Sequence, residues 1–263
     1  MELQDPTFEI QKTVVLAFAD TTRVAGYRAA LSLWTQLASS GECTSTSLHY
    51  ASPAKLTLTP HTEDALSLAP ASASTQLTIT LATAARLPLV TFCFVNGLPA
   101  AEYVADLADQ LVSVLEARGV DRLVVPAAVN LVGLRDSEHL WTWGAGEVAE
   151  EVGARRVPEG GVRTDDAFLA AVCGLAEVAE IGVAALVHGD KRPSGSSGRL
   201  RTTFGREYAD EWDAQVVGAL AAAVAAAVPG MPAACNSAGA VQAEVTRTCH
   251  DVESSAKGLA VYA

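Results

Sequence analysis

The sequence predicts an α/β fold: a mostly parallel sheet flanked by helices, with an antiparallel hairpin at one edge and a C-terminal tail. Uncharged β-type runs alternate with amphipathic helical segments between residues 89 and 228, which is typical of parallel sheets with crossover helices. Residues 55–59 (KLTLT) and 76–81 (QLTITL) alternate apolar side chains with threonine and therefore predict two half-exposed, paired strands. Half of the 263 residues are hydrophobic, so the chain can bury a sizeable core.

The N-terminal part begins with a strand followed by a helix. Residues 13–19 (TVVLAFA) carry no charge and predict a strand covered on both faces. Residues 26–37 place Tyr27, Leu31 and Trp34 on one side of a helix. The segment 61–74 between the two alternating strands is rich in serine, alanine and proline, and predicts a loop.

The middle of the chain predicts a second strand, helix and strand. Residues 89–95 (LVTFCFV) form a buried strand, Pro99 opens an amphipathic helix, and Gly119 follows that helix as its left-handed terminator. Residues 122–129 (RLVVPAAV) form the next strand, in which Pro126 marks the end or a bulge. A polar stretch containing two tryptophans continues to residue 163.

The last predicted elements complete the domain. Thr164 or Asp165 can cap a helix that leads into a buried strand at residues 181–188. A long helix spans residues 206–228 and ends at Pro229-Gly230. Its apolar stripe repeats every four residues: Tyr208, Trp212, Val216 and Leu220. The sequence therefore predicts one α/β domain over residues 1–229 and a partly flexible tail over residues 230–263.

Composition limits the class of protein. The formal net charge of -12 argues against a generic nucleic-acid binder and against anionic membrane surfaces. The five cysteines show no C-x-x-C spacing, which suits a reducing compartment. The N-terminus lacks the features of a signal peptide, and the longest apolar run, residues 216–228, is too short to span a bilayer. We expect a protein of the cytoplasm, with the nucleus as a further location.

Catalytic signals in the sequence are weak. No G-x-G-x-x-G or G-x-S-x-G motif occurs, and the lysine of the Gly/Ser loop at residues 189–198 precedes Gly195 and Gly198 instead of following them as in a P-loop. The histidines show no metal-binding spacing, so no metal or cofactor is predicted. His188, at the end of a predicted strand, is the best catalytic candidate. A small-molecule hydrolase or phosphorylase is therefore the alternative to a non-catalytic protein.

A basic segment stands out in this acidic chain. It can contact an acidic partner surface, or it can be a solvated loop without a partner. Its members are Lys191, Arg192, Arg199, Arg201 and Arg206.

The last three residues, Val261, Tyr262 and Ala263, follow the pattern hydrophobic–tyrosine–X with a free carboxylate. Proteasome activators and assembly factors use this pattern to dock between two α-subunits. The aliphatic side chain fills an apolar slot, the tyrosine ring packs while its hydroxyl donates or accepts a hydrogen bond, and the carboxylate pairs with a lysine. A flexible tail of 30 residues would span about 30 Å, which suits a tether for such a motif.

The element order and this ending together resemble the proteasome assembly chaperone 1 family. The resemblance covers most of the chain and rests on four segments: TVVLAFADTTRVAGYRAAL, LVTFCFV, RLVVPAAV and TDDAFLAAVCGLAEVAEIGVAALVHGD. It implies an α/β chaperone without catalytic activity that forms a heterodimer with a second chaperone subunit. It also implies that the heterodimer binds 20S α-subunits and promotes assembly of the α-ring. Val261, Tyr262 and Ala263 occupy the place of the family's docking motif.

Overall fold

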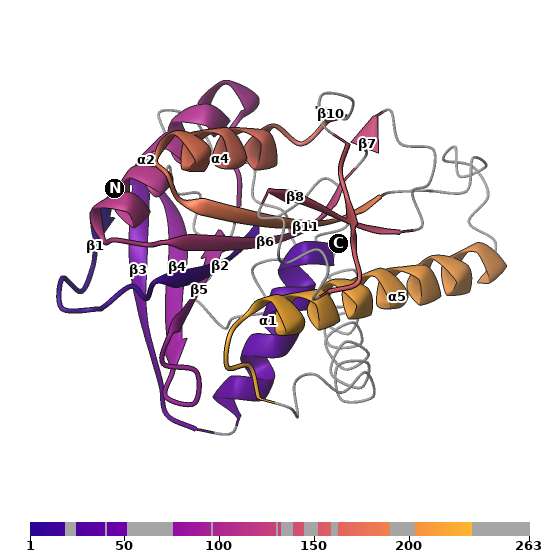
Figure 1. Ribbon diagram of the computed structural model, residues 1–263, viewed down its shortest axis with the longest axis horizontal. Coiled ribbons are helices and arrows are strands. Elements are labelled where there is room, and N and C mark those ends of the chain that lie inside the picture. The colour runs from indigo at the N-terminus through magenta and orange to yellow at the C-terminus, as the bar shows by residue number, and fades with distance from the viewer. Residues whose placement is uncertain are drawn as a thin grey trace, which may run out of the picture.

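The centre of the molecule is a sheet with helices on both faces (Figure 1). The structure is a computed structural model and describes residues 1–18, 25–39, 41–51, 76–95, 97–129, 131–132, 139–144, 152–158, 163–189 and 203–232. The strands are β1 (Glu2–Leu3), β2 (Thr13–Phe18), β3 (Cys43–Ala51), β4 (Gln76–Ala84), β5 (Val90–Val95), β6 (Arg122–Val129), β7 (Leu131–Val132), β8 (Leu140–Gly144), β9 (Arg155–Arg156), β10 (Arg163–Thr164) and β11 (Gly182–Gly189). The helices are α1 (Ala25–Ala38), the short 3-10 helix η1 (Ala101–Tyr103), α2 (Val104–Ala117), α4 (Ala167–Val178) and α5 (Thr203–Ala227).

The strand order of the main sheet is β1-β3-β4-β5-β2-β6-β11-β8-β9. The central strands β5, β2, β6 and β11 are mutually parallel. On one side β4, β3 and β1 continue the sheet in antiparallel fashion, and on the other side β8 is antiparallel to β11. A separate pair, β7 and β10, is also antiparallel. These findings confirm the α/β class, the parallel centre and the antiparallel edge.

Successive residues of the central strands point to opposite faces of the sheet and fill two cores. In β2, Val15 and Ala17 belong to the core that α1 and α5 cover, whereas Val14, Leu16 and Phe18 belong to the core under α2 and α4. Figure 1 shows these two helix pairs on opposite sides of the sheet. This double cover explains why the central strands are uncharged runs instead of alternating ones.

The antiparallel edge has a different partner strand from the one that the sequence predicts. Residues 55–59 lie outside the described residues, and the strand that pairs with β4 is β3, in register from Cys43 opposite Ala84 to Ala51 opposite Gln76. The other side of β4 pairs with β5. The sequence analysis missed β3 because serine and threonine fill most of its N-terminal half, where Cys43, Thr44 and Ser45 are exposed.

Pro126 does not end β6 or form a bulge there. The strand continues to Val129, and Pro126 lies opposite Leu186 of β11. The ladder with β2 stops at Val124, so Pro126 lies beyond the part of β6 that is paired on both sides. A proline is tolerated in this position because the missing N–H falls where one neighbouring strand has already left the ladder.

Two helix starts differ from their predictions, whereas one helix end is confirmed. Pro99 does not open a helix directly, because η1 intervenes before α2. The cap of α4 is Asp166 instead of Thr164 or Asp165: its Oδ1 accepts a 2.9 Å hydrogen bond from the backbone N–H of Leu169. Gly119 has a φ of 69° and ends α2 as predicted.

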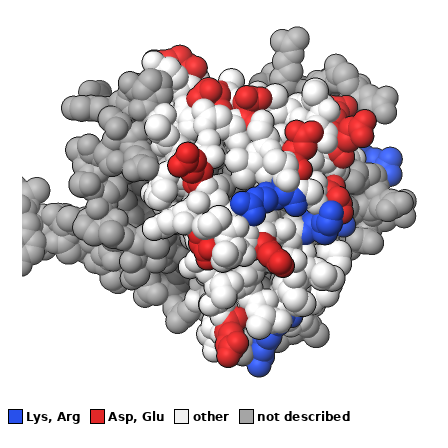
Figure 2. All heavy atoms as spheres, turned by 90° about the vertical axis from the view of Figure 1, so that its left-hand side faces the viewer, with Lys and Arg blue, Asp and Glu red and all other residues white. Residues whose placement is uncertain are grey.

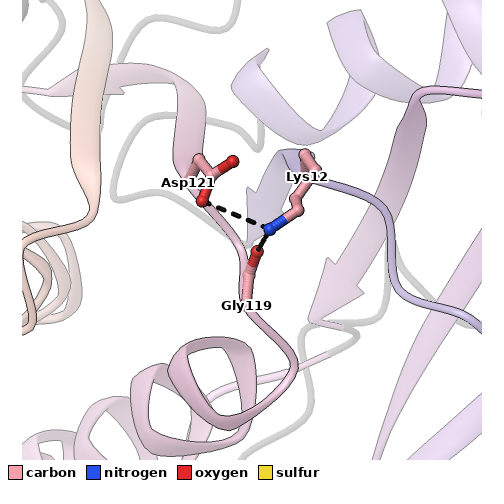
Figure 3. Close-up of polar contacts among 3 residues, drawn as sticks. All are labelled: Lys12, Gly119 and Asp121. Atoms are coloured by element: carbon pink, nitrogen blue, oxygen red, sulfur yellow. Dashed lines mark hydrogen bonds and ion pairs between the residues drawn. The ribbon is translucent and has the colours of Figure 1, made fainter.

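The loop after α2 is fastened to the start of β2. The Lys12 ammonium donates a 2.8 Å hydrogen bond to the Gly119 carbonyl and lies 3.5 Å from an Asp121 carboxylate oxygen (Figure 3). Both charged side chains are mostly exposed, so this ion pair contributes little to stability. The backbone adds two further bonds, from the N–H groups of Asp121 and Arg122 to the Lys12 carbonyl.

A second network joins the N-terminus, α2 and β3. Tyr50 donates a 2.8 Å hydrogen bond to Asp106, which also accepts a bond from Gln110. The Met1 ammonium donates to the Gln110 side chain at 3.1 Å. The network holds α2 against the antiparallel edge.

The stretch that the sequence analysis interpreted as polar contains β8 and β9. Trp141 is buried, whereas Trp143, which lies two residues further along β8 and so points to the same face, is 40% exposed. Within the described part of the chain, no helix combines the length and the apolar character needed to cross a membrane.

Candidate functional site

The residues of the predicted docking motif, Val261, Tyr262 and Ala263, lie outside the described residues. The same holds for the basic residues Lys191, Arg192, Arg199 and Arg201, and the structure describes only the backbone of Arg206. Their roles therefore stay predictions. The described chain ends just after α5, where Gly230 has a φ of 77°, so the predicted end of the last helix at Pro229-Gly230 is confirmed.

His188, the catalytic candidate, lies near the end of β11 and is 9% exposed. Its Nδ1 is 3.0 Å from the backbone carbonyl oxygen of Gly189, and its register neighbours are Ala128 and Leu140. A ring bonded to the adjacent backbone and flanked by apolar strands has the setting of a structural histidine. In the described part of the chain no group of three His, Cys, Asp or Glu side chains could hold a metal ion.

The buried thiols do not have the setting of nucleophiles. Burial raises the pKa of the fully buried Cys93 thiol far above its usual range. Burial, together with the negative charges of Asp166 and Glu177, raises the pKa of Cys173 to about 12. Both side chains are therefore neutral at physiological pH, whereas a reactive cysteine requires a lowered pKa.

These shifts predict a loss of stability in alkaline solution. Burial raises the pKa of Tyr27 strongly, and burial with the Asp106 hydrogen bond raises that of Tyr50 to about 12. In alkaline solution the folded state keeps protons that unfolded tyrosines and cysteines lose. The contribution of these groups to the free energy of unfolding is therefore complete below pH 9 and declines as the pH rises toward 12. Each such group should steepen the decline by up to about 1.4 kcal/mol per pH unit.

Urea denaturation at pH 8, 9, 10 and 11 measures this decline. Tyr50→Phe is the matched control, because it removes one titrating group and should make the decline shallower between pH 10 and 11. A free energy of unfolding that stays constant up to pH 11 would contradict the assignment.

The outer surface of α2 carries a row of acidic residues. The exposed side chains Glu102, Asp106, Asp109 and Glu116 recur at helical spacing on η1 and α2. Figure 2 views the side of the molecule on which β1 lies, and acidic side chains are spread over it while basic ones gather in smaller groups. This side of the molecule favours basic partners and repels acidic ones.

The outer surface of α4, which packs beside α2, carries small exposed residues and one exposed acidic residue, Glu177. Ala167, Ala170 and Gly174 are exposed, and Val178 is 83% exposed. Small side chains lose little conformational entropy on contact and let another surface approach closely. Sequence analysis did not identify this surface, because the alanines fit a buried helix as well as an exposed one.

Comparisons with known proteins relate the chain through its fold. No protein-family model matches it, and no curated protein matches it. PbaB of Pyrococcus furiosus, an archaeal proteasome activator, superposes with a TM-score of 0.57 at 10% identity over 96% of each chain. A protein of unknown function from Thermoplasma acidophilum superposes with a TM-score of 0.55 at 10% identity, over 97% of this chain and 91% of the other.

A third solved structure is PbaA of Pyrococcus furiosus, an archaeal homolog of proteasome-assembly chaperone. It superposes with a TM-score of 0.50 at 15% identity over 85% of each chain. At such identities the similarity concerns the fold alone. The chain therefore shares its fold with an archaeal proteasome activator and with an archaeal homolog of proteasome-assembly chaperone.

Proposed function

We propose that this chain is a proteasome assembly chaperone that acts by binding and not by catalysis. The observation that carries the proposal is the fold, which matches PbaB over 96% of both chains. The chaperone pairs with a second chaperone subunit, binds 20S α-subunits and promotes assembly of the α-ring. It acts in the cytoplasm or the nucleus.

In this proposal the α/β domain and the tail make separate contacts. The domain covers one face of the ring, and the tail docks Val261, Tyr262 and Ala263 in a pocket between two α-subunits. The tether turns the second contact into an intramolecular event, which raises the overall affinity by about 10²–10⁴-fold without any other new contact. Val261 fills the apolar slot, Tyr262 packs its ring, and the Ala263 carboxylate pairs with a lysine of the α-subunit.

The basic segment has a supporting role in this proposal. Lys191, Arg192, Arg199 and Arg201 face an acidic patch of the ring or of the partner subunit. Charges of this kind steer association and make its rate depend on ionic strength. They would also offset repulsion between an acidic partner and the acidic row on α2.

Removal of Val261, Tyr262 and Ala263 should weaken binding to 20S particles at least tenfold and leave the thermal unfolding midpoint unchanged. The tail would lose its anchor, whereas the domain would keep its core. Surface plasmon resonance on immobilised core particles and on free α-subunits, with and without the co-purified partner subunit, measures the affinities.

A chain extended by one glycine after Ala263 is the matched control. It keeps all three side chains but moves the carboxylate, and it should bind as weakly as the truncated chain. If the truncated chain kept full affinity, the domain alone would carry the interaction. If no form of the chain bound, even with the partner present, the proposal would fail and the hydrolase or phosphorylase alternative would have to be tested on His188.

A further inference from the structure

We propose that the cavity between Arg122 and the C-terminal end of α5 binds a small carboxylate that also carries an N–H group. The cavity has a volume of about 360 Å³ and is lined by Arg122 and residues 225–231. This volume lies within the usual range of small-molecule sites, which starts at about 300 Å³. The proposed site goes beyond the proposed function, because docking on the ring does not require it.

Arg122 is one of the residues that line the cavity. It is the first residue of β6, in register with Thr13 and Gly182 of the flanking strands. Its Nε and Nη2 atoms are buried and have no hydrogen-bond partner. Within the described part of the chain, Arg122 forms no ion pair with a carboxylate. Buried donors without a partner destabilise the folded chain, and more strongly when the group is charged.

The last turn of α5 supplies acceptors on the other wall. Pro229 has no N–H to donate to the Ala225 carbonyl. Beyond the helix, the main-chain bonds run from Val228 to Val224 and from Met231 to Val228. The carbonyls of residues 225–227 thus receive no main-chain hydrogen bond from residues 228–232. These carbonyls form the negative end of the helix dipole.

A ligand that satisfies both walls must carry an acceptor pair and a donor. The Nε–Nη2 edge of a guanidinium presents two parallel N–H groups and matches a carboxylate bidentately. Binding requires the Arg122 side chain to turn so that this edge enters the cavity, where the ligand would bond the unpartnered donors. The helix carbonyls select an N–H donor and repel a phosphate dianion. An N-acyl amino acid unit, free or at the end of a polypeptide, has this chemistry.

Isothermal titration of the full chain with N-acetyl-alanine tests the site. We expect saturable binding that Arg122→Gln weakens at least tenfold. Arg118→Gln, which removes the same charge from an exposed residue at the end of α2, should change it less than twofold. N-acetyl-alanine amide should bind at least tenfold more weakly than the acid. Equal affinity for acid and amide, equal effects of the two arginine variants, or inorganic phosphate binding as tightly as the acid would each overturn the proposal.

Two further measurements complete the test. A synthetic peptide of residues 257–263 with a free carboxylate identifies the source: tenfold tighter binding than N-acetyl-alanine favours a polypeptide end, and equal binding favours a free small acid. If Arg122→Gln fails to fold, NMR titration of the unaltered chain replaces it. The Arg122 Nε–H signal and the amides of residues 225–231 should then shift, and shifts confined to other residues would refute the site.

Discussion

Gly26→Ala should lower the free energy of unfolding by at least about 3 kcal/mol, the upper end of the usual cost of overpacking a core. A Cβ atom on Gly26 would lie 2.0 Å from the carbonyl oxygen of Pro126 and 2.9 Å from the Cα of Ala127. Both neighbours are backbone atoms of a central strand, so no side chain can turn away to make room. Helix α1 would have to move off the sheet and would lose its packing against α5.

Gly174→Ala is the matched control, because it makes the same chemical change in another helix. A Cβ at Gly174 meets no heavy atom within 4 Å. Alanine is favoured over glycine inside a helix by about 0.5–1 kcal/mol, so this variant should be more stable than the parent. Urea denaturation of both variants gives the two free energies. Equal effects would show that the close approach of α1 to Pro126 is absent in solution.

Phe92→Ala should lower the free energy of unfolding by about 3–5 kcal/mol, as for other buried phenylalanines. Phe92 is 1% exposed in β5, and its ring centroid lies 5.6 Å from that of Trp34 and 6.1 Å from that of Phe94. Phe94 in turn contacts Tyr27 edge to face at 5.5 Å. These rings join β5 to α1. Removal of the Phe92 ring therefore opens a cavity and also removes aromatic contacts.

Phe92→Leu separates these two contributions. Leucine keeps most of the buried volume but loses the ring contacts. The free energy of unfolding should therefore fall by about 1–2 kcal/mol, less than in the alanine variant. Chemical denaturation monitored by tryptophan fluorescence suits both variants, because Trp34 lies next to the altered ring. If the alanine and leucine variants lost the same amount, the β5–α1 core would not be packed as described.

The central layers could be predicted from sequence because burial on both faces leaves a plain signal. The uncharged runs became β2, β5, β6 and β11, and the residues with helical spacing became α1, α2, α4 and α5. The end of α2 was predictable because Gly119 stands where a left-handed residue is needed. The end of α4 carries no such signal, since Glu180 adopts a φ of 58° there.

Features that depend on distant contacts could not be predicted. Nothing in the neighbouring sequence distinguishes Gly26 from an ordinary glycine in the first turn of a helix. A side chain is excluded there by the carbonyl of Pro126, which lies 100 residues away in the sequence. The strand β3 carries a serine-rich pattern that is defined only by its pairing with β4. The cavity at Arg122 likewise joins the start of β6 to the end of α5, which only the folded chain brings together.

The two ends of the main sheet restrict how a partner can approach. β1 and β9 are two residues long, and β9 consists of Arg155 and Arg156, both exposed. A peptide that binds by β-augmentation needs a longer row of open main-chain groups than either strand offers. Short, charged outer strands also protect a sheet from joining another sheet edge to edge. Neither outer strand of the described sheet therefore suits the docking of an extended peptide, and both limit edge-to-edge association with another sheet.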